Sequence, residues 1–303
     1  MRLNFPSDPP PPPMTWLAPG LIPLQGLTVL SGPPGGGKSA LATALAVAAS
    51  EGGKWLGGPI EPTGVVLWLA YEAVASTTRR IRSVAPKAKI AVASDLPLLS
   101  ADKATGVLRK AVEQVSDHFG RQVGLVIVDA FAAAMRGGDE NSGRDVGKAL
   151  EPLLTLAEHL PVMLISHTGK AGGAETRGHS SVTADATAAL AVVRNGSSKR
   201  LRTIKQRDAE PAADVTFRLE ERSGSPWPVP VAADAARPRS ASLPPDAQLM
   251  LEVISDFKSP VEFEEVRAIC KKNMSCGRTA HLAGAVLSGR QYPTHARCLA
   301  SAA

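Results

Sequence analysis

The sequence predicts an α/β fold built on a mostly parallel β-sheet. Three observations support this class. Short apolar runs alternate with helical segments along the first two thirds of the chain, as they do in parallel sheets. A glycine-rich segment separates the first predicted strand from the first predicted helix. Several apolar runs end at a polar or charged residue, and in open α/β sheets that strand end faces the ligand crevice.

The glycine-rich segment matches the phosphate-loop pattern G-x-x-x-x-G-K-[ST]. Residues 27–31 read as a strand before it, and residues 40–50 read as a helix after it. Glycine lets the backbone curl around phosphate oxygens, and the helix N-terminus adds partial positive charge. Lys38 is expected to reach the β- and γ-phosphates, and Ser39 to ligate Mg²⁺. The residues expected to bind ATP are Gly32, Pro33, Pro34, Gly35, Gly36, Gly37, Lys38 and Ser39.

Composition sets limits on the class of protein. A chain of 303 residues can hold one large α/β domain and a small appendage. The net charge of +6 permits a nucleic-acid partner without requiring one, because there is no long Lys/Arg run. We expect a cytoplasmic protein without a membrane partner, since the sequence has neither a spanning apolar run nor a signal-peptide pattern. Its three cysteines, Cys270, Cys276 and Cys298, are expected to be reduced structural thiols. Their odd number and the cytosolic setting argue against disulfides, and their spacing matches no usual zinc site.

A second strand, residues 64–70, is followed by Tyr71 and Glu72. A carboxylate at this edge of the sheet could polarise the water that attacks the γ-phosphate. An acidic residue at the start of a helix would also interact favourably with the helix dipole. Position alone leaves both interpretations open. The helix predicted over residues 76–84 has a basic face formed by Arg79, Arg80 and Arg82, which we interpret as solvated.

Two later strands end at candidate site residues. Residues 123–129 form an apolar strand ending in Asp129, the Walker B pattern, which predicts a carboxylate that holds Mg²⁺ directly or through water. Residues 161–166 form another, and His167 follows it beside the expected γ-phosphate. A lone histidine is usually structural, but this position favours a sensor of the γ-phosphate.

The segments after these two strands are predicted as loops at the edge that holds the nucleotide. They span residues 131–143 and 168–176, and Arg136 and Lys170 give them positive charge. We expect both loops to line a central channel and to contact the phosphates of single-stranded DNA. Between the strands, further helices are predicted over residues 102–119 and 144–160 and a short strand over residues 89–93.

The end of the domain changes character. Residues 186–193 and 198–206 read as strands joined by the hairpin signal Asn195-Gly196, and residues 215–219 read as a third strand. This pattern predicts an antiparallel extension of the parallel sheet. Lys205 and Arg207 are two residues apart, so on a strand they point to the same face.

In this order the motifs resemble the RepA-like branch of the RecA/DnaB-type P-loop ATPases, the hexameric helicases of plasmids, phages and related elements. The resemblance covers about residues 15–222 and implies a RecA-like fold. It implies that Glu72 is the catalytic base and that Asp129 is the Walker B carboxylate. His167 would sense the γ-phosphate and couple it to the DNA-binding loops. Lys205 and Arg207 would be supplied in trans to the nucleotide of the neighbouring subunit.

The predicted domain organisation has four parts. Residues 1–14 include a run of prolines and are expected to form a disordered leader. Residues 15–222 form the ATPase domain, and residues 223–245 form a proline-rich linker. Residues 246–303 read as a small helical, winged-helix-like module. The basic residues of that module could touch DNA or form a solvated face; they are Lys271, Lys272 and Arg278.

The function expected from these features is that of a ring-forming ATPase, a replicative DNA helicase that moves on single-stranded DNA as a homo-hexamer. A recombination or repair ATPase is the alternative among enzymes. A regulatory ATP-binding switch that moves no DNA is the alternative of a different class. A small-molecule P-loop kinase is disfavoured by the late Lys205 and Arg207 pair and by the antiparallel extension.

Overall fold

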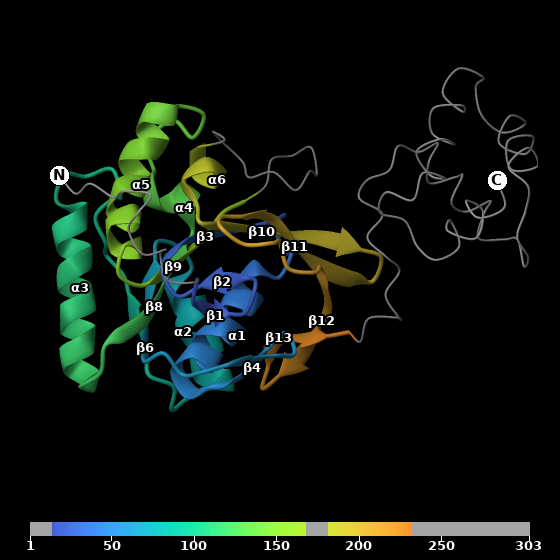
Figure 1. Cartoon of the computed structure of the whole chain (residues 1–303). Helices are drawn as coiled ribbons and strands as arrows, with labels where there is room; N and C mark the ends of the chain where they lie inside the picture. The colour runs from blue at the N-terminus through green and yellow to red at the C-terminus, as the bar shows by residue number, and fades with distance from the viewer. Residues whose placement is uncertain (1–13, 168–180, 232–303) are drawn as a thin grey trace, which may run out of the picture. The chain divides into compact units, whose positions relative to one another are not determined.

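A computed structural model describes residues 14–167 and 181–231 of the chain (Figure 1). The predicted leader up to residue 13, the loop containing Lys170, and the predicted C-terminal module lie outside the described residues. The chain consists of two compact units that divide after Ala232, and all the residues that the structure describes belong to the first unit. Within them, no helix has the length and apolar character needed to cross a membrane.

Nine strands form one mixed sheet in the order β13-β12-β11-β10-β3-β9-β8-β6-β7. The strands from β10 to β7 are parallel, and β11, β12 and β13 are antiparallel. The predicted fold class is therefore confirmed, including the antiparallel extension. The strands are β3 (Gly26–Ser31), β6 (Val65–Ala70), β7 (Ile90–Ala93), β8 (Val123–Asp129), β9 (Pro161–Ile165), β10 (Ala188–Asn195), β11 (Ser198–Gln206), β12 (Val215–Arg222) and β13 (Ser225–Pro230).

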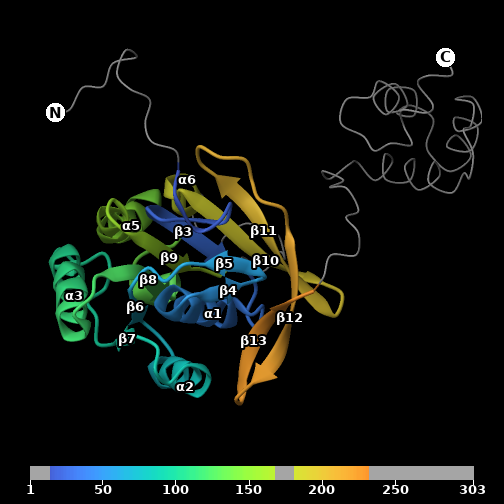
Figure 2. The same ribbon diagram turned by 60° about the horizontal axis from the view of Figure 1, so that its bottom comes forward.

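Helices cover both faces of this sheet (Figures 1 and 2). One apolar core joins the sheet to α1 and α2, and the other joins it to α3, α5 and α6. Two short hairpins lie outside the main sheet: β1 (Trp16–Ala18) with β2 (Ile22–Pro23), and β4 (Gly53–Trp55) with β5 (Gly58–Ile60). The helices are α1 (Lys38–Glu51), α2 (Val74–Val84), α3 (Ala104–Phe119), α4 (Phe131–Ala134), α5 (Gly143–Ala157) and α6 (Ser181–Asp185).

The central parallel strands position the site because their C-terminal ends meet at one edge of the sheet. Every residue of β6 and of β9 is buried, as expected for strands with helices on both faces. Their sequences are continuous apolar runs for that reason. Strands β3, β6, β8 and β9 end together, so the polar residues that follow them lie at a common edge.

Two predictions about the chain are wrong in part. The segment predicted as a loop over residues 131–143 begins with the short helix α4. The linker predicted over residues 223–245 contains β13, which pairs with β12 from Arg222↔Ser225 to Phe217↔Pro230. The prolines of this segment are spaced two apart. On an edge strand they can therefore all turn their missing N–H groups away from the ladder.

Side-chain contacts attach β13 to the helical layer. The hydroxyl groups of Ser83 on α2 and Ser225 on β13 are 2.8 Å apart and hydrogen bonded. Trp227 packs against the core around α1 and against a small cluster containing Val47 and Val84. The guanidinium carbon of Arg222 lies 4.4 Å from the centroid of the Trp227 ring. Residues 225–230 are therefore an integral part of the ATPase domain.

Replacing Trp227 with Ala should lower the free energy of unfolding by about 1–3 kcal/mol, because a half-buried indole loses its apolar contacts. Arg222→Ala is the matched control. It removes the cation–π contact alone, which contributes about 0.5–1 kcal/mol at an exposed site. Denaturant unfolding measures both changes. Equal stability of Trp227→Ala and the native chain would mean that this segment behaves as a linker.

Candidate nucleotide site

The phosphate loop connects β3 to α1 and requires glycine at positions with positive φ. Gly37, with φ of 96°, caps the N-terminus of α1. Gly32 lies so close to β10 that a Cβ there would be 2.9 Å from the Val192 carbonyl oxygen. A side chain at either position would strain the loop or collide with its neighbour. The predicted strand, loop and helix are all present, so the geometry needed to hold phosphate follows from the local sequence.

Lys38 is buried at the floor of this loop, with 5% of its surface exposed. Its Nζ donates hydrogen bonds to the carbonyl oxygens of Gly32 at 2.9 Å and Pro33 at 3.1 Å. Burial lowers the pKa of the Lys38 ammonium, and the nearby carboxylates of Asp129 and Glu72 raise it. The ammonium group is thus folded back onto its own loop, in reach of any phosphate that the loop holds.

His167 joins Lys38 to Glu72. The Nζ atom of Lys38 lies 3.2 Å from Nδ1 of His167, and Nε2 of His167 lies 4.0 Å from Oε1 of Glu72. An ammonium group has only donors, so Nδ1 accepts and the ring proton resides on Nε2, the atom that faces the carboxylate. Three predicted site residues, which follow β3, β6 and β9 in sequence, are thus connected by consecutive contacts.

Asp129 ends β8 and is only 6% exposed. Burial is the main cause that raises its pKa from 3.8 to about 6; the Glu72 carboxylate adds to this, while Arg80 and Lys38 oppose it. Its backbone carbonyl accepts hydrogen bonds from the N–H groups of Tyr71 at 2.8 Å and Glu72 at 3.3 Å. The turn after β6 is thereby fixed to the end of β8, which holds Glu72 beside the cavity.

The residues predicted to bind Mg²⁺ fit a hard cation. Ser39 and Asp129 line the same cavity, of about 240 Å³, which also contains Lys38, Glu72 and His167. A hydroxyl and a carboxylate with phosphate oxygens are ligands that Mg²⁺ favours. Burial raises the pKa of Asp129, and a cation bound beside it would stabilise its ionised form.

Sequence reasoning missed Arg80. Arg79 and Arg82 are exposed as predicted, but Arg80 lines the nucleotide cavity and lowers the pKa of Asp129. Its Nη1 atom is buried and has no hydrogen-bond partner among the residues that the structure describes. One signal was available: Thr77, Ile81 and Val84 form the buried stripe of α2, and Arg80 occupies the i+3 position of that stripe.

Lys205 and Arg207 do not join this site. They point to the same face, as predicted, where Lys205 Nζ donates to the carbonyl of Thr183 at 3.1 Å and Arg207 Nη2 to that of Ala184 at 3.5 Å. Both acceptors belong to α6, which immediately precedes β10. Because β10 runs parallel to β3, its beginning lies at the edge of the sheet opposite to the phosphate loop. The two cations are therefore remote from the nucleotide cavity of their own chain.

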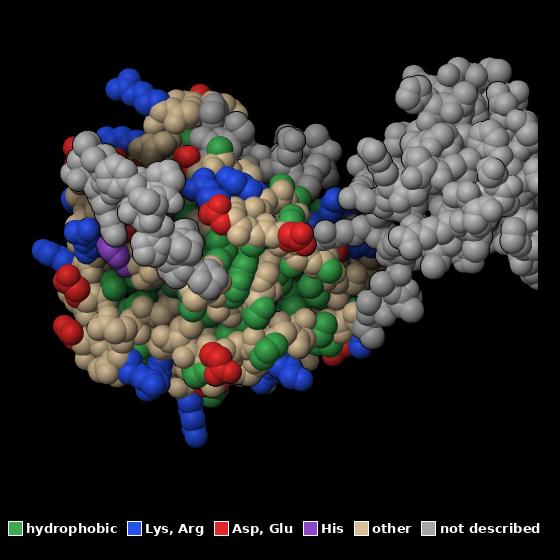
Figure 3. Space-filling model, in the orientation of Figure 1, with side chains coloured by type: hydrophobic (Ala, Val, Ile, Leu, Met, Phe, Trp, Pro, Cys, Tyr) green, Lys and Arg blue, Asp and Glu red, His purple; other side chains and the backbone are tan. Residues whose placement is uncertain are grey.

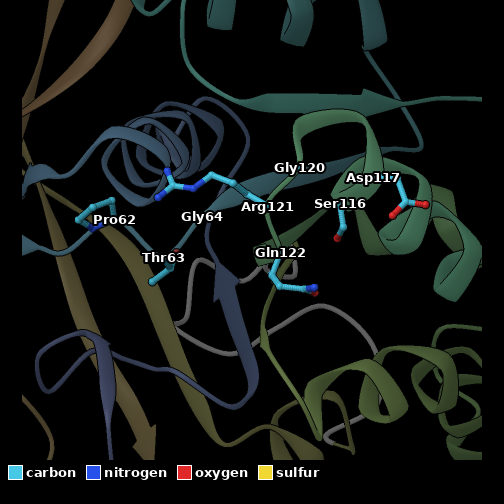
Figure 4. Close-up of a pocket in the computed structure, with 8 residues that line it drawn as sticks. All are labelled: Pro62, Thr63, Gly64, Ser116, Asp117, Gly120, Arg121 and Gln122. Atoms are coloured by element: carbon cyan, nitrogen blue, oxygen red, sulfur yellow. The ribbon is translucent and has the colours of Figure 1, made fainter.

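A larger cavity, of about 590 Å³, lies at that opposite edge, between the N-terminal ends of β6 and β8. Its polar side chains include those of Asp117, Arg121 and Gln122. In Figure 4 these three side chains point in different directions, so they do not converge on a common ligand. Among the described residues, the candidate catalytic and phosphate-binding side chains line the smaller cavity at the other edge of the sheet.

The raised pKa of Asp129 predicts a pH-dependent stability for the nucleotide-free protein. The folded state holds this proton more tightly than the unfolded state between pH 3.8 and about 6, so the free energy of unfolding falls as the pH rises through that window. The amide of Asp129→Asn does not ionise, so this variant does not lose stability as the pH rises through that window. The variant should exceed the native chain in stability by about 1–3 kcal/mol at pH 8 and by much less at pH 4. Denaturant unfolding at both pH values tests this, and an equal difference at both would contradict it.

Comparison with known families gives a match over more than half of the chain. The model of a family described as an AAA domain matches residues 3–173, which is more than half of the chain. A comparison with curated proteins found no match. The matched region contains the phosphate loop, Glu72, Asp129 and His167. P-loop ATPase domains of this kind in general bind ATP with Mg²⁺, which agrees with the cavity. The chain belongs to the AAA domain family of P-loop ATPases.

Proposed function

We propose that this protein is a ring-forming ATPase, a replicative DNA helicase that couples ATP hydrolysis to movement on single-stranded DNA. The observation that carries the enzymatic part is the position of Glu72. Its side chain is 48% exposed and lies 4.0 Å from His167, while its backbone is hydrogen bonded to the end of β8. A fixed carboxylate that water can reach is suited to act as a general base.

The residues that line the nucleotide cavity have separate proposed roles in ATP hydrolysis. Lys38 exchanges its bonds to the Gly32 and Pro33 carbonyls for bonds to the phosphate oxygens. Ser39 and Asp129 line the same cavity and would hold Mg²⁺, which would supply positive charge beside the phosphates. Glu72 would orient the attacking water and accept its proton as the bond between the γ-phosphorus and the bridging oxygen of ADP breaks, so that ADP and phosphate leave. His167 contacts Lys38, so movement of the Lys38 ammonium to the phosphates would alter this contact and let His167 sense the occupied site.

The remote position of Lys205 and Arg207 supports a ring. A cation that stabilises charge on the transferred phosphoryl group must lie beside it. In this chain the pair instead binds the carbonyl oxygens of α6 at the opposite edge of the sheet. A second subunit that presents this edge to the nucleotide cavity of the first would place its own Lys205 and Arg207 beside the nucleotide of the first subunit. Within one chain the pair cannot reach that position. In a closed homo-oligomer, proposed here as a hexamer, every nucleotide cavity would receive Lys205 and Arg207 from the neighbouring subunit.

The proposed contact with DNA rests on the nucleotide edge of the sheet. Arg136 is exposed just after α4, in the segment that follows Asp129. Lys170 lies outside the described residues. On the face in Figure 3, Lys and Arg side chains are scattered and do not form one continuous patch. The path proposed for DNA runs along the two loop segments that carry Arg136 and Lys170.

Single-stranded DNA should stimulate ATP hydrolysis by the native chain, and Glu72→Gln should bind ATP but hydrolyse it about 100- to 10,000-fold more slowly. Glu61→Gln, an exposed glutamate outside the cavity, is the matched control and should hydrolyse ATP normally. A phosphate-release assay with and without DNA measures these rates. A rate of hydrolysis that does not change when DNA is added would favour a regulatory switch. A Glu72→Gln rate within about threefold of the native rate would show that Glu72 is not the general base.

Arg207→Ala should bind ATP normally but hydrolyse it about 1,000-fold or more slowly, as expected when an arginine finger is lost. Mixing tests whether Arg207 acts across subunits. Arg207→Ala chains retain an intact cavity, and Glu72→Gln chains retain Arg207, so joint rings should regain hydrolysis. Native mass spectrometry in ATP establishes that the mixture forms joint assemblies. Joint assemblies that stay inactive would show that Arg207 does not act in trans.

A further inference from the structure

The nucleotide cavity has a wall that does not come from the phosphate loop or from the ends of the parallel strands. Leu219 on β12 and Pro226 on β13 line the same cavity as Lys38 and Asp129. They belong to the antiparallel extension, more than a hundred residues after the phosphate loop in sequence. Figure 2 places this hairpin beside α1 and α2, and the Ser83–Ser225 hydrogen bond fixes it to α2.

The two residues share one face of the hairpin. Leu219 pairs with Pro228 across the ladder, and Pro226 is two residues before Pro228, so all three lie on the same side of the strands. The contact with the loop is close, since a Cβ built at Gly37 would be 3.2 Å from Cδ1 of Leu219. Leu219 thus lies directly against Gly37, the residue that caps the N-terminus of α1.

Burial separates the floor of the cavity from its rim. Lys38 and Asp129 are almost fully buried, whereas Leu219 is half-buried and Pro226 is exposed. The charged groups that suit phosphate and Mg²⁺ are at the floor. The cavity of about 240 Å³ is smaller than the ~300–1,000 Å³ of pockets that enclose a whole ligand. A nucleotide whose phosphates lie at the floor would therefore extend toward the rim, where Leu219 and Pro226 lie.

We propose that Leu219 and Pro226 form the nucleoside-binding wall of the site, against which the base or ribose of ATP packs. This rests on the proposed function and specifies it. Uncharged, apolar side chains offer nothing to a phosphate group but cover the apolar faces of a nucleoside. The antiparallel extension then has a role in ligand affinity as well as in the fold. Its attachment to α2, which also holds Arg80 in the cavity, keeps the wall at a fixed distance from the floor.

Binding of inorganic tripolyphosphate separates the two parts of the site, because it has the phosphates of ATP without the nucleoside. Isothermal titration in Mg²⁺ compares both ligands on the native chain, Leu219→Ala, Pro226→Ala and the double variant. Pro226 is exposed, so its replacement should leave the fold intact if Leu219→Ala does not fold. Pro230→Ala is the matched control, an exposed proline on the same strand outside the cavity.

The double variant should weaken ATP binding by about 5- to 20-fold, as expected for the loss of a few apolar contacts, and leave tripolyphosphate binding within about twofold. Pro230→Ala should change neither. If the binding of both ligands weakened equally, the wall would be a support for the phosphate loop. If the binding of neither ligand weakened, the wall would not be part of the nucleotide site. Both outcomes overturn the inference. A native chain that binds ATP no more tightly than tripolyphosphate overturns it as well. A native chain that binds neither ligand would instead refute the proposed function itself.

Discussion

The nucleotide site depends on one buried ammonium group, that of Lys38, which lies against the phosphate loop and needs hydrogen-bond partners there. Lys38 is satisfied by the carbonyls of Gly32 and Pro33 and by the His167 ring. An unpaired cation at this depth would cost several kcal/mol, so these partners keep the loop curled around the position of the phosphates. The glycines, the end of β9 and the approach of β10 are all arranged to make those contacts possible.

The same edge of the sheet concentrates negative charge that the protein compensates only in part. Glu72 and Asp129 both raise the pKa of Lys38, and Glu72 raises that of Asp129. Arg80 and Lys38 oppose this, but burial of Asp129 dominates. Polar groups kept in such an environment reduce stability and are characteristic of sites selected for ligand binding. Mg²⁺ and phosphate supply opposite charges to the two halves of the cavity, which is why the ligands and the site suit one another.

Much of this arrangement could be predicted because it follows from local sequence. The phosphate loop has a fixed spacing, and buried parallel strands read as apolar runs, so their C-terminal residues Glu72, Asp129 and His167 could be placed at one edge. Arg80 was missed because a charged helix face usually indicates solvent, although this residue falls within the stripe that Thr77, Ile81 and Val84 bury. The strand β13 was missed because three prolines indicate a linker, whereas spacing them two apart also suits an edge strand. The nucleoside wall joins residues distant in sequence, which no local pattern reveals.

The affinity of Lys38→Ala for Mg²⁺ and ATP, measured by calorimetry with the unfolding transition recorded in parallel, tests the central claim most directly. Lys54→Ala, an exposed lysine outside the cavity, is the matched control and should bind as tightly as the native chain. Loss of a buried, charge-assisted contact to phosphate predicts that Lys38→Ala binds about 100-fold or more weakly while it still unfolds cooperatively. Native affinity in folded Lys38→Ala would show that the cavity around this residue is not where the nucleotide binds.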